Sequence, residues 1–287
     1  MQPAPKRPYT LCVDDPIDPI NPFDEGPFDD DPFDGDDAAF GGDGSFGGTG
    51  DDEPGRETVH VNFATPIPIF VMPEVTLLPQ QVTPLHIFEP RYRQMVTHAL
   101  DGAGLIGMAI AAANVPSEDY QNNPPIKPCV CVGRIVQHEK LPDGRYNVLL
   151  QGVCRARIAE GLAPDDDHLY RRAVLEPIHD TQADDDLLAD TRAWLSHQLD
   201  AGPLAELTAA EPILEYVRSD DVPTHALLEL VGFALLPPGD LRYKLLSEPS
   251  AATRAGLIHA ELDRLSRTIS RAKRQDIDDW PKGCAWN

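Results

Sequence analysis

The sequence predicts an α+β fold in which a β-barrel is followed by an α-helical bundle, behind an acidic N-terminal tail that is disordered. Residues 1–57 are rich in Asp, Gly and Pro, a composition that favours disorder. Residues 66–180 hold short runs of Val, Ile and Leu between turn residues, which is typical of strands. Residues 184–273 place apolar residues at helical spacing. We expect these two regions to form one two-part unit or two small domains.

The tail holds 16 acidic and 3 basic residues, against 31 and 21 in the rest of the chain. It has no sustained period of 3.6 or 2, so it cannot bury enough apolar surface to offset the entropy of ordering. Pro-Phe-Asp occurs at residues 22–24, 27–29 and 32–34, which indicates either a solubilising tail or short adhesive motifs. Residues 42–47 match G-x-G-x-x-G, but without a strand before and a helix after, they do not predict a dinucleotide site.

A strand-to-helix corner is predicted where the chain reads PLHIFEPRYRQM, at residues 84–95. The apolar strand ends at Phe88. Glu89 then suits the positive end of a helix dipole, and Pro90 fits the first turn, where a missing N–H costs nothing. One apolar helix face follows, and Gly102 is placed to end the helix; the face consists of Tyr92, Met95, Val96, Ala99 and Leu100.

The charged and aromatic residues of this corner suggest a site, but a structural interpretation is favoured. Glu89 and Arg93 lie four residues apart at the start of the predicted helix. They are therefore expected to form an ion pair worth about a few tenths of a kcal/mol. Arg91 lies between them. Phe88 and Tyr92 are expected in the core rather than in contact with a ligand. We therefore interpret the corner as a structural element.

The remaining strands follow in short apolar runs. Pro142, Asp143 and Gly144 have the chemistry of a tight turn, because Pro fixes φ, Asp bonds to the backbone and Gly takes a positive φ. The return strand from Tyr146 is partly apolar on both faces. The other strands are expected at residues 105–112, 129–139, 155–159 and 171–178. Together these strands predict a closed or half-closed barrel.

Two loops interrupt the strands, at residues 114–128 and 163–168. Both are candidate binding loops on a rigid scaffold or merely solvated insertions. The helical region is punctuated by Gly202, Pro223 and the pair Pro237-Pro238. Helices are expected at residues 187–199, 205–217, 224–236, 240–246 with Asp240 as the cap, and 250–269 with Ser250 at the start.

Several of these segments resemble, in the same order, motifs of the Lon protease N-terminal (substrate-binding) domain family, which also includes stand-alone proteins and occurs in cereblon. The matching segments are the corner preceded by Leu77-Leu78-Pro79, and residues 132–135, 141–148, 151–158 and 170–177. The resemblance covers residues 66–275. It implies a PUA-like β pseudo-barrel at residues 66–180, followed by the helical bundle of that domain.

The resemblance identifies ten positions as family motif residues with a structural role. They are Phe88, Glu89, Pro90, Arg91, Tyr92, Gly133, Asp143, Gly144, Gly152 and Arg155. The chain departs from the family at one point. Leu78-Pro79-Gln80 stands where the family usually has a Phe-Pro-Gly type of turn, so we expect a differently shaped loop before the corner.

The chemistry of the sequence predicts a protein that is not an enzyme. It has no phosphate-binding loop, no His-Glu-x-x-His and no Gly-x-Ser-x-Gly, and we expect no cofactor. Cys129 and Cys131 share a strand face but lack a second ligand pair, which indicates buried small residues rather than a zinc site. His138 and His168 have no evident partner and are interpreted as surface residues. Scattered cysteines and the absence of a signal segment or an 18-residue apolar run favour a cytoplasmic location without membrane contact.

Taken with the resemblance, these observations predict a protein-binding module in quality control. It would hold unfolded or apolar protein segments, and a separate protease or chaperone would act on them. The alternative is RNA binding by a PUA-like barrel. A face containing Arg155, Arg157, Arg171 and Arg172 supports that alternative, whereas the net negative charge of the folded part argues against a nucleic-acid partner. A degenerate hydrolase is a third, weaker interpretation, because no nucleophile motif is present.

Overall fold

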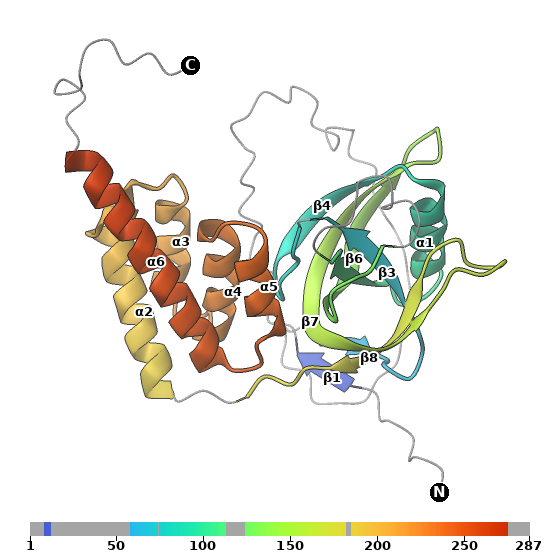
Figure 1. The fold of residues 1–287 in the computed structure, drawn as a ribbon, viewed down its shortest axis with the longest axis horizontal. Coiled ribbons are helices and arrows are strands. Elements are labelled where there is room, and N and C mark those ends of the chain that lie inside the picture. The colour runs from blue at the N-terminus through green and yellow to red at the C-terminus, as the bar shows by residue number, and fades with distance from the viewer. Residues whose placement is uncertain (1–8, 13–57, 74, 113–123, 182–184, 275–287) are drawn as a thin grey trace, which may run out of the picture.

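The computed structural model describes residues 9–12, 58–73, 75–112, 124–181 and 185–274. This part of the chain has a mixed α+β fold with one six-stranded sheet, a separate two-stranded sheet and six α-helices. Figure 1 shows helices α2 to α6 gathered on one side of the six-stranded sheet and helix α1 on the other. Most of the expected disordered tail, residues 1–57, lies outside the described residues.

The six-stranded sheet curls back on itself. Its strand order is β4-β7-β6-β5-β3-β8, and β8 pairs with β7 as well as with β3. Only β3 and β5 run parallel; the other pairs are antiparallel. The strands are β3 (Ile67–Met72), β4 (Val82–Ile87), β5 (Leu105–Ile110), β6 (Cys129–Lys140), β7 (Tyr146–Leu162) and β8 (Arg172–Pro177).

Strand β7 differs from the sequence prediction, which placed a return strand from Tyr146 and a separate strand at residues 155–159. The structure has one 17-residue strand that pairs with β4, β6 and β8 in turn. Gly152 lies inside this strand and does not interrupt it. Its lack of a side chain has a packing reason, because the backbone at Leu78 approaches too closely to leave room for a Cβ atom. Register shifts at Val132/Gly133, Ile135/Gln137 and Ile158/Glu160 bend the strands, since each bulge increases local twist.

The helical part follows β8. It consists of α2 (Asp185–Asp200), a 3-10 helix (Pro203–Glu206), α3 (Ala210–Arg218), α4 (Thr224–Leu235), α5 (Asp240–Ser247) and α6 (Ala251–Arg274). The helix expected at residues 205–217 is therefore two elements, because Leu207 is extended, with ψ of 136°. Asp240 is not the cap of α5: Gly239 holds that position, and the Asp240 carboxylate pairs with Lys127 instead. Ser250 does begin α6, where its Oγ accepts a hydrogen bond from the Thr253 N–H.

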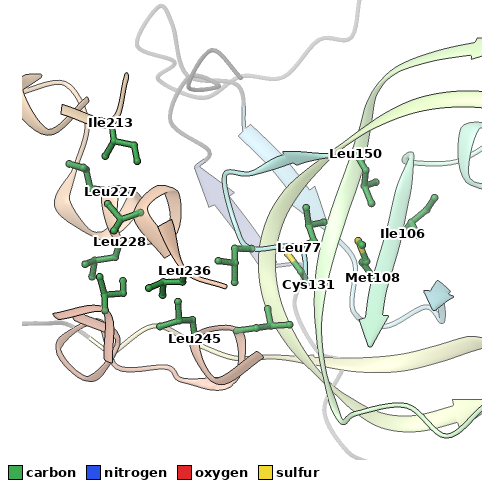
Figure 2. Close-up of a cluster of buried hydrophobic side chains, with 14 of the residues drawn as sticks. Leu77, Ile106, Met108, Cys131, Leu150, Ile213, Leu227, Leu228, Leu236 and Leu245 are labelled. Carbon is green, nitrogen blue, oxygen red and sulfur yellow. The ribbon is translucent and has the colours of Figure 1, made fainter. Parts of the chain in front are cut away.

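The larger apolar core joins the curled sheet to the helices. Figure 2 shows Leu77 between the two parts, with Cys131 and Leu150 on its sheet side and Leu236 and Leu245 on its helical side. All five side chains are buried. A second core fills the other face of the sheet, around Ile69, Val132 and Leu175. Because one core spans both parts, the position of the helices is fixed by apolar packing rather than by the linker alone.

A separate two-stranded sheet precedes the main sheet in the chain. Strand β1 (Tyr9–Cys12) pairs antiparallel with β2 (Thr58–Val61), with Cys12 opposite Thr58. The expectation that residues 1–57 contain no regular structure is therefore wrong for residues 9–12. Four residues are too few for a sustained sequence period, and the pairing is made across more than forty residues of chain, so local patterning gave no signal for it. The side chains of residues 9–12 are not described.

Candidate functional site

The ten motif residues lie in two places in the structure. Seven of them surround the corner between β4 and α1 (Pro90–Leu100): Phe88, Glu89, Pro90, Arg91, Tyr92, Asp143 and Gly144. The hairpin between β6 and β7 approaches the corner because Arg93 Nη1 donates a hydrogen bond to the Asp143 carbonyl oxygen at 3.1 Å. The other three, Gly133, Gly152 and Arg155, lie where the sheet meets the helices.

Phe88 is exposed, which corrects the expectation that it belongs to the core. Its side chain is 61% exposed, whereas the preceding Ile87 is 2% exposed. Since neighbouring residues of an extended chain point in opposite directions, burying Ile87 turns Phe88 outward. The Phe88 ring stacks on the His86 ring at a centroid distance of 6.3 Å. The inward and outward alternation of residues along β4 was the signal available in the sequence. The prediction gave more weight to the apolar character of Phe88, which suggested burial.

The charges at the corner also differ from the expected arrangement. Glu89 is the residue before the first helical turn, and its carboxylate pairs with Arg91 at 2.9 Å rather than with Arg93. Pro90 occupies the first turn as predicted. Tyr92 is buried, as expected, and its ring meets Phe70 edge to face at 4.5 Å. Burial raises the pKa of the Tyr92 hydroxyl, since the phenolate would be poorly solvated there.

Strand β4 forms an edge of the curled sheet next to Phe88. Among the described strands it pairs with β7 alone. Pro84 has no backbone N–H to donate. An edge strand tolerates this missing donor, which also limits pairing with a further strand. His86 is fixed by Asn147, at 2.7 Å between Nδ1 and Oδ1, and Asn147 in turn donates to Glu139. The result is an edge that presents an exposed aromatic ring on a rigid polar support.

At the junction of sheet and helices, Arg155 is buried and paired with Glu229 of α4, the two side chains being 4% and 5% exposed. Arg254 of α6 shares the same carboxylate oxygen at 3.2 Å and makes two further bonds to Asp180. Burial opposes the charge on Arg155, but Glu229 and Asp180 outweigh it, so the pKa of Arg155 is raised. The expected basic face is therefore wrong: Arg155 lies in the interior, and Arg172 pairs with Asp165 at 2.5 Å.

A group of rings at the far end of α1 was missed by sequence reasoning. The rings of His98, His168 and Tyr170 pack against one another edge to face, with centroids 5.6 to 5.8 Å apart. His168 is not without a partner, because its Nδ1 lies 2.9 Å from Asp165 Oδ1. These rings line a hollow of about 470 Å³ together with Arg172. The spacing of Asp165 and His168 by three residues was the only local signal; His98 is brought in from another element.

Cysteine and metal chemistry can be assessed over the part of the chain that the structure describes. No group of three or more His, Cys, Asp or Glu side chains there is placed to hold a metal ion. Cys129, Cys131 and Cys154 are buried and unpaired. Burial raises the pKa of Cys154 to about 12 and that of Cys131 well above its ordinary value, so both remain thiols at neutral pH. Over the same residues, no helix combines the length and apolarity needed to cross a bilayer.

Comparison with known proteins agrees with this architecture. No curated protein sequence gives a significant match. The N-terminal domain of a Lon protease from the Mycobacterium avium complex superposes with a TM-score of 0.53 and 18% identity, over 68% of this chain and 96% of that one. A Lon N-terminal domain protein from Xanthomonas campestris gives a TM-score of 0.49 and 19% identity, over 68% and 98% of the two chains.

The curled sheet with its appended helices therefore has the fold of a Lon N-terminal domain. A family model for the ATP-dependent protease La (LON) substrate-binding domain matches residues 66–264, and the chain belongs to that family. The resemblance inferred from the motifs is thereby confirmed.

Proposed function

We propose that this protein is a non-enzymatic module that binds unfolded or apolar protein segments in the cytoplasm, for proteolysis or quality control by a separate protease or chaperone. Membership of the substrate-binding family supports this proposal. We further propose that the curled sheet is a PUA-like pseudo-barrel. Residues 66–180 would form this barrel domain of the protein, and residues 184–273 would form a helical domain. Most of the ten motif positions would serve the fold. The pairing of β8 with both β3 and β7 supports the pseudo-barrel.

The observation that carries the binding proposal is the exposure of Phe88 beside the edge of β4 that no described strand covers. An exposed aromatic ring contributes apolar contact at low entropic cost, since it has only two side-chain torsions. Pro84 shortens the edge available for strand addition, so the ring, rather than a long ladder of backbone bonds, would supply most of the contact. Phe88 would then be a contact residue with a client segment.

The test compares Phe88→Ala with Leu187→Ala in the full chain. Leu187 is a matched control because it is also an exposed large apolar residue, 42% exposed, but lies on α2 in the helical part. Binding of a permanently unfolded, carboxymethylated protein is measured by fluorescence anisotropy. Phe88→Ala is expected to weaken binding at least tenfold while the midpoint of thermal unfolding changes little, and Leu187→Ala is expected to leave both unchanged.

Equal binding by the wild type and Phe88→Ala would remove Phe88 from the proposal. A salt titration of client binding and of RNA binding, carried out side by side, distinguishes the proposed function from the RNA alternative. No feature of the described residues favours that alternative. Apolar client binding should survive rising salt, whereas RNA affinity would fall with a log–log slope of about −0.7 for each phosphate contact on a single strand. Salt-sensitive RNA binding without client binding would overturn the proposed function.

A further inference from the structure

The hollow at the far end of α1 has walls from several separate elements of the chain. They are β2, the turn between β2 and β3, the end of α1, the start of β5, and the loop that leads into β8. Its volume of about 470 Å³ lies in the range of ligand pockets, about 300–1,000 Å³. We call it the ring hollow. Its described lining combines three rings with an apolar wall, namely His98, His168, Tyr170, Pro66, Ile67 and Leu105.

The rings of this hollow suit a further aromatic ring. The planes of His98, His168 and Tyr170 meet at 63 to 84°, so each edge faces the face of another ring. Aromatic rings prefer this arrangement because the positive edge of one lies against the negative face of the next. The hydroxyl of Tyr170 is bonded to His98 Nδ1 at 2.9 Å, which holds the two rings in position. A phenylalanine ring would extend the same packing into the hollow.

The polar part of the wall suits an acid next to such a ring. Arg172 lines the hollow and donates to Asp165 through Nη2, while its Nε has no hydrogen-bond partner among the described residues. Asp101 is the single carboxylate in the described lining. In a chain with a net charge of −23, this wall therefore combines few acids with an arginine that still has a donor to satisfy. An aromatic residue followed by a carboxylate matches both parts of the wall.

One segment of the chain begins and ends at the rim of the ring hollow. His60 of β2 lines the hollow, and Thr58, two residues earlier, lies opposite Cys12 of β1. Both ends of residues 13–57 are thereby held beside the hollow. These residues include all 16 acidic residues of the N-terminal tail, with Arg56 as their one basic residue, and they contain the three Pro-Phe-Asp repeats.

We propose that the ring hollow binds the Pro-Phe-Asp repeats at residues 22–34 of the same chain. The phenylalanine packs against the rings, and the aspartate that follows it accepts from the side of Arg172. The first repeat begins ten residues after Cys12, which gives a reach of about 33–36 Å from a point beside the hollow. A segment tethered at both ends has an effective concentration of about 1 mM, so even a weak site is occupied. The proposal does not depend on client binding at Phe88.

The first experiment observes the ring hollow in the full chain by NMR. The test variant replaces the phenylalanine of every repeat, as Phe23→Ala, Phe28→Ala and Phe33→Ala. The Cε1–Hε1 signals of His98 and His168 are expected to move in this variant, because a phenylalanine ring in the hollow shifts them by its ring current. The matched control removes two phenylalanines of the same segment outside the repeats, as Phe40→Ala and Phe46→Ala, and should leave both signals in place. Signals that stay unchanged in the test variant would overturn the proposal.

The second experiment adds the repeats as a separate molecule. A fluorescent peptide of residues 21–35 is titrated into the test variant, whose own repeats no longer compete. Ala103→Phe, which adds a ring at an exposed position of the wall, is expected to weaken peptide binding at least tenfold. Ala159→Phe, at an exposed position of β7, is the matched control and should retain it. Neither exposed substitution should lower the midpoint of unfolding, and equal peptide binding by the two would exclude the hollow as the site.

Protein concentration distinguishes occupation within one chain from occupation between two chains. The His98 and His168 signals of the wild type are expected to be the same in dilute and concentrated samples. Signals that move as the concentration rises would place the segment of a second copy in the hollow and would overturn occupation within one chain. Binding of carboxymethylated protein that Ala103→Phe blocks, without any binding of the repeat peptide, would make the hollow a client site and would also overturn the proposal.

Discussion

Gly152→Ala provides a sharp test of the packing at the junction of sheet and helices. A Cβ built at Gly152 would lie 2.1 Å from the Leu78 carbonyl oxygen, 2.9 Å from the Leu78 carbonyl carbon and 3.2 Å from Cys131 Sγ, where ordinary contacts begin at 3.4 Å. The segment at Leu78 would have to move by more than 1 Å. Movement of the Leu78 side chain offers no relief, because the closest atoms belong to the backbone.

The cost follows from what holds that segment in place. The Gln80 N–H donates to the Gly152 carbonyl and the Gly152 N–H donates to the Gln81 carbonyl, both at 2.8 Å. Overpacking a core costs about 1–3 kcal/mol, and losing two backbone hydrogen bonds costs about 1 kcal/mol each. We therefore expect Gly152→Ala to lower the free energy of unfolding by about 3–5 kcal/mol, a large fraction of the total for a domain.

The measurement is a urea titration of the full chain followed by far-ultraviolet circular dichroism. Gly161→Ala is the matched control: it lies on the same strand, no atom lies within 4 Å of the added Cβ, and its φ is not positive. That control should be neutral or stabilise the protein by up to about 1 kcal/mol, because alanine loses less chain entropy than glycine. A loss below 1 kcal/mol for Gly152→Ala, similar to Gly161→Ala, would refute the packing described for β7.

Three further predictions concern backbone strain, the buried charges and acid stability. Gln80 has φ of 68°, the left-handed region, so Gln80→Gly should raise the unfolding free energy by up to about 1 kcal/mol; an unchanged urea midpoint would contradict this. Glu229→Gln leaves Arg155 and Arg254 without their shared buried carboxylate and should cost about 3–5 kcal/mol in the same titration, whereas Glu261→Gln, whose partner Arg264 is exposed, should cost under about 0.5 kcal/mol. The pKa of Asp165 is lowered, chiefly by hydrogen bonding to His168, so its stabilising contribution is present above pH 3.8 and lost as the pH falls through the lowered value. Asp165→Asn should therefore flatten the acid end of a pH–stability profile, and an unaltered profile would contradict the assignment.

Local signals in the sequence predicted the elements whose cause is local. Pro90 begins α1 because its missing N–H is harmless in the first turn, and Ser250 begins α6 through its own side-chain bond. Gly144 takes φ of 82° in the turn between β6 and β7, as the turn chemistry required. The substitution of Gln80 for the usual glycine of the family was visible in the sequence, and the structure places that residue in the left-handed region.

The candidate sites depended on contacts that no local pattern records. Arg155 and Glu229 are 74 residues apart, and their pairing converted an expected basic face into a buried link between sheet and helices. His98 and Tyr170 are 72 residues apart. The exposure of Phe88 depends on which residues of β4 face the core, and only the pairing of β4 with β7 fixed that choice.

The sequence by itself determined the α+β composition, the strand-rich part that precedes a helical part, and membership of the family, because these follow from apolar periodicity, turn residues and ordered motifs. The tertiary structure alone decided which polar residues lie inside and which apolar ring lies outside. The physical reason is that burial and charge pairing depend on which distant segments approach one another. That approach is set by the curling of the sheet and by the core that it shares with the helices.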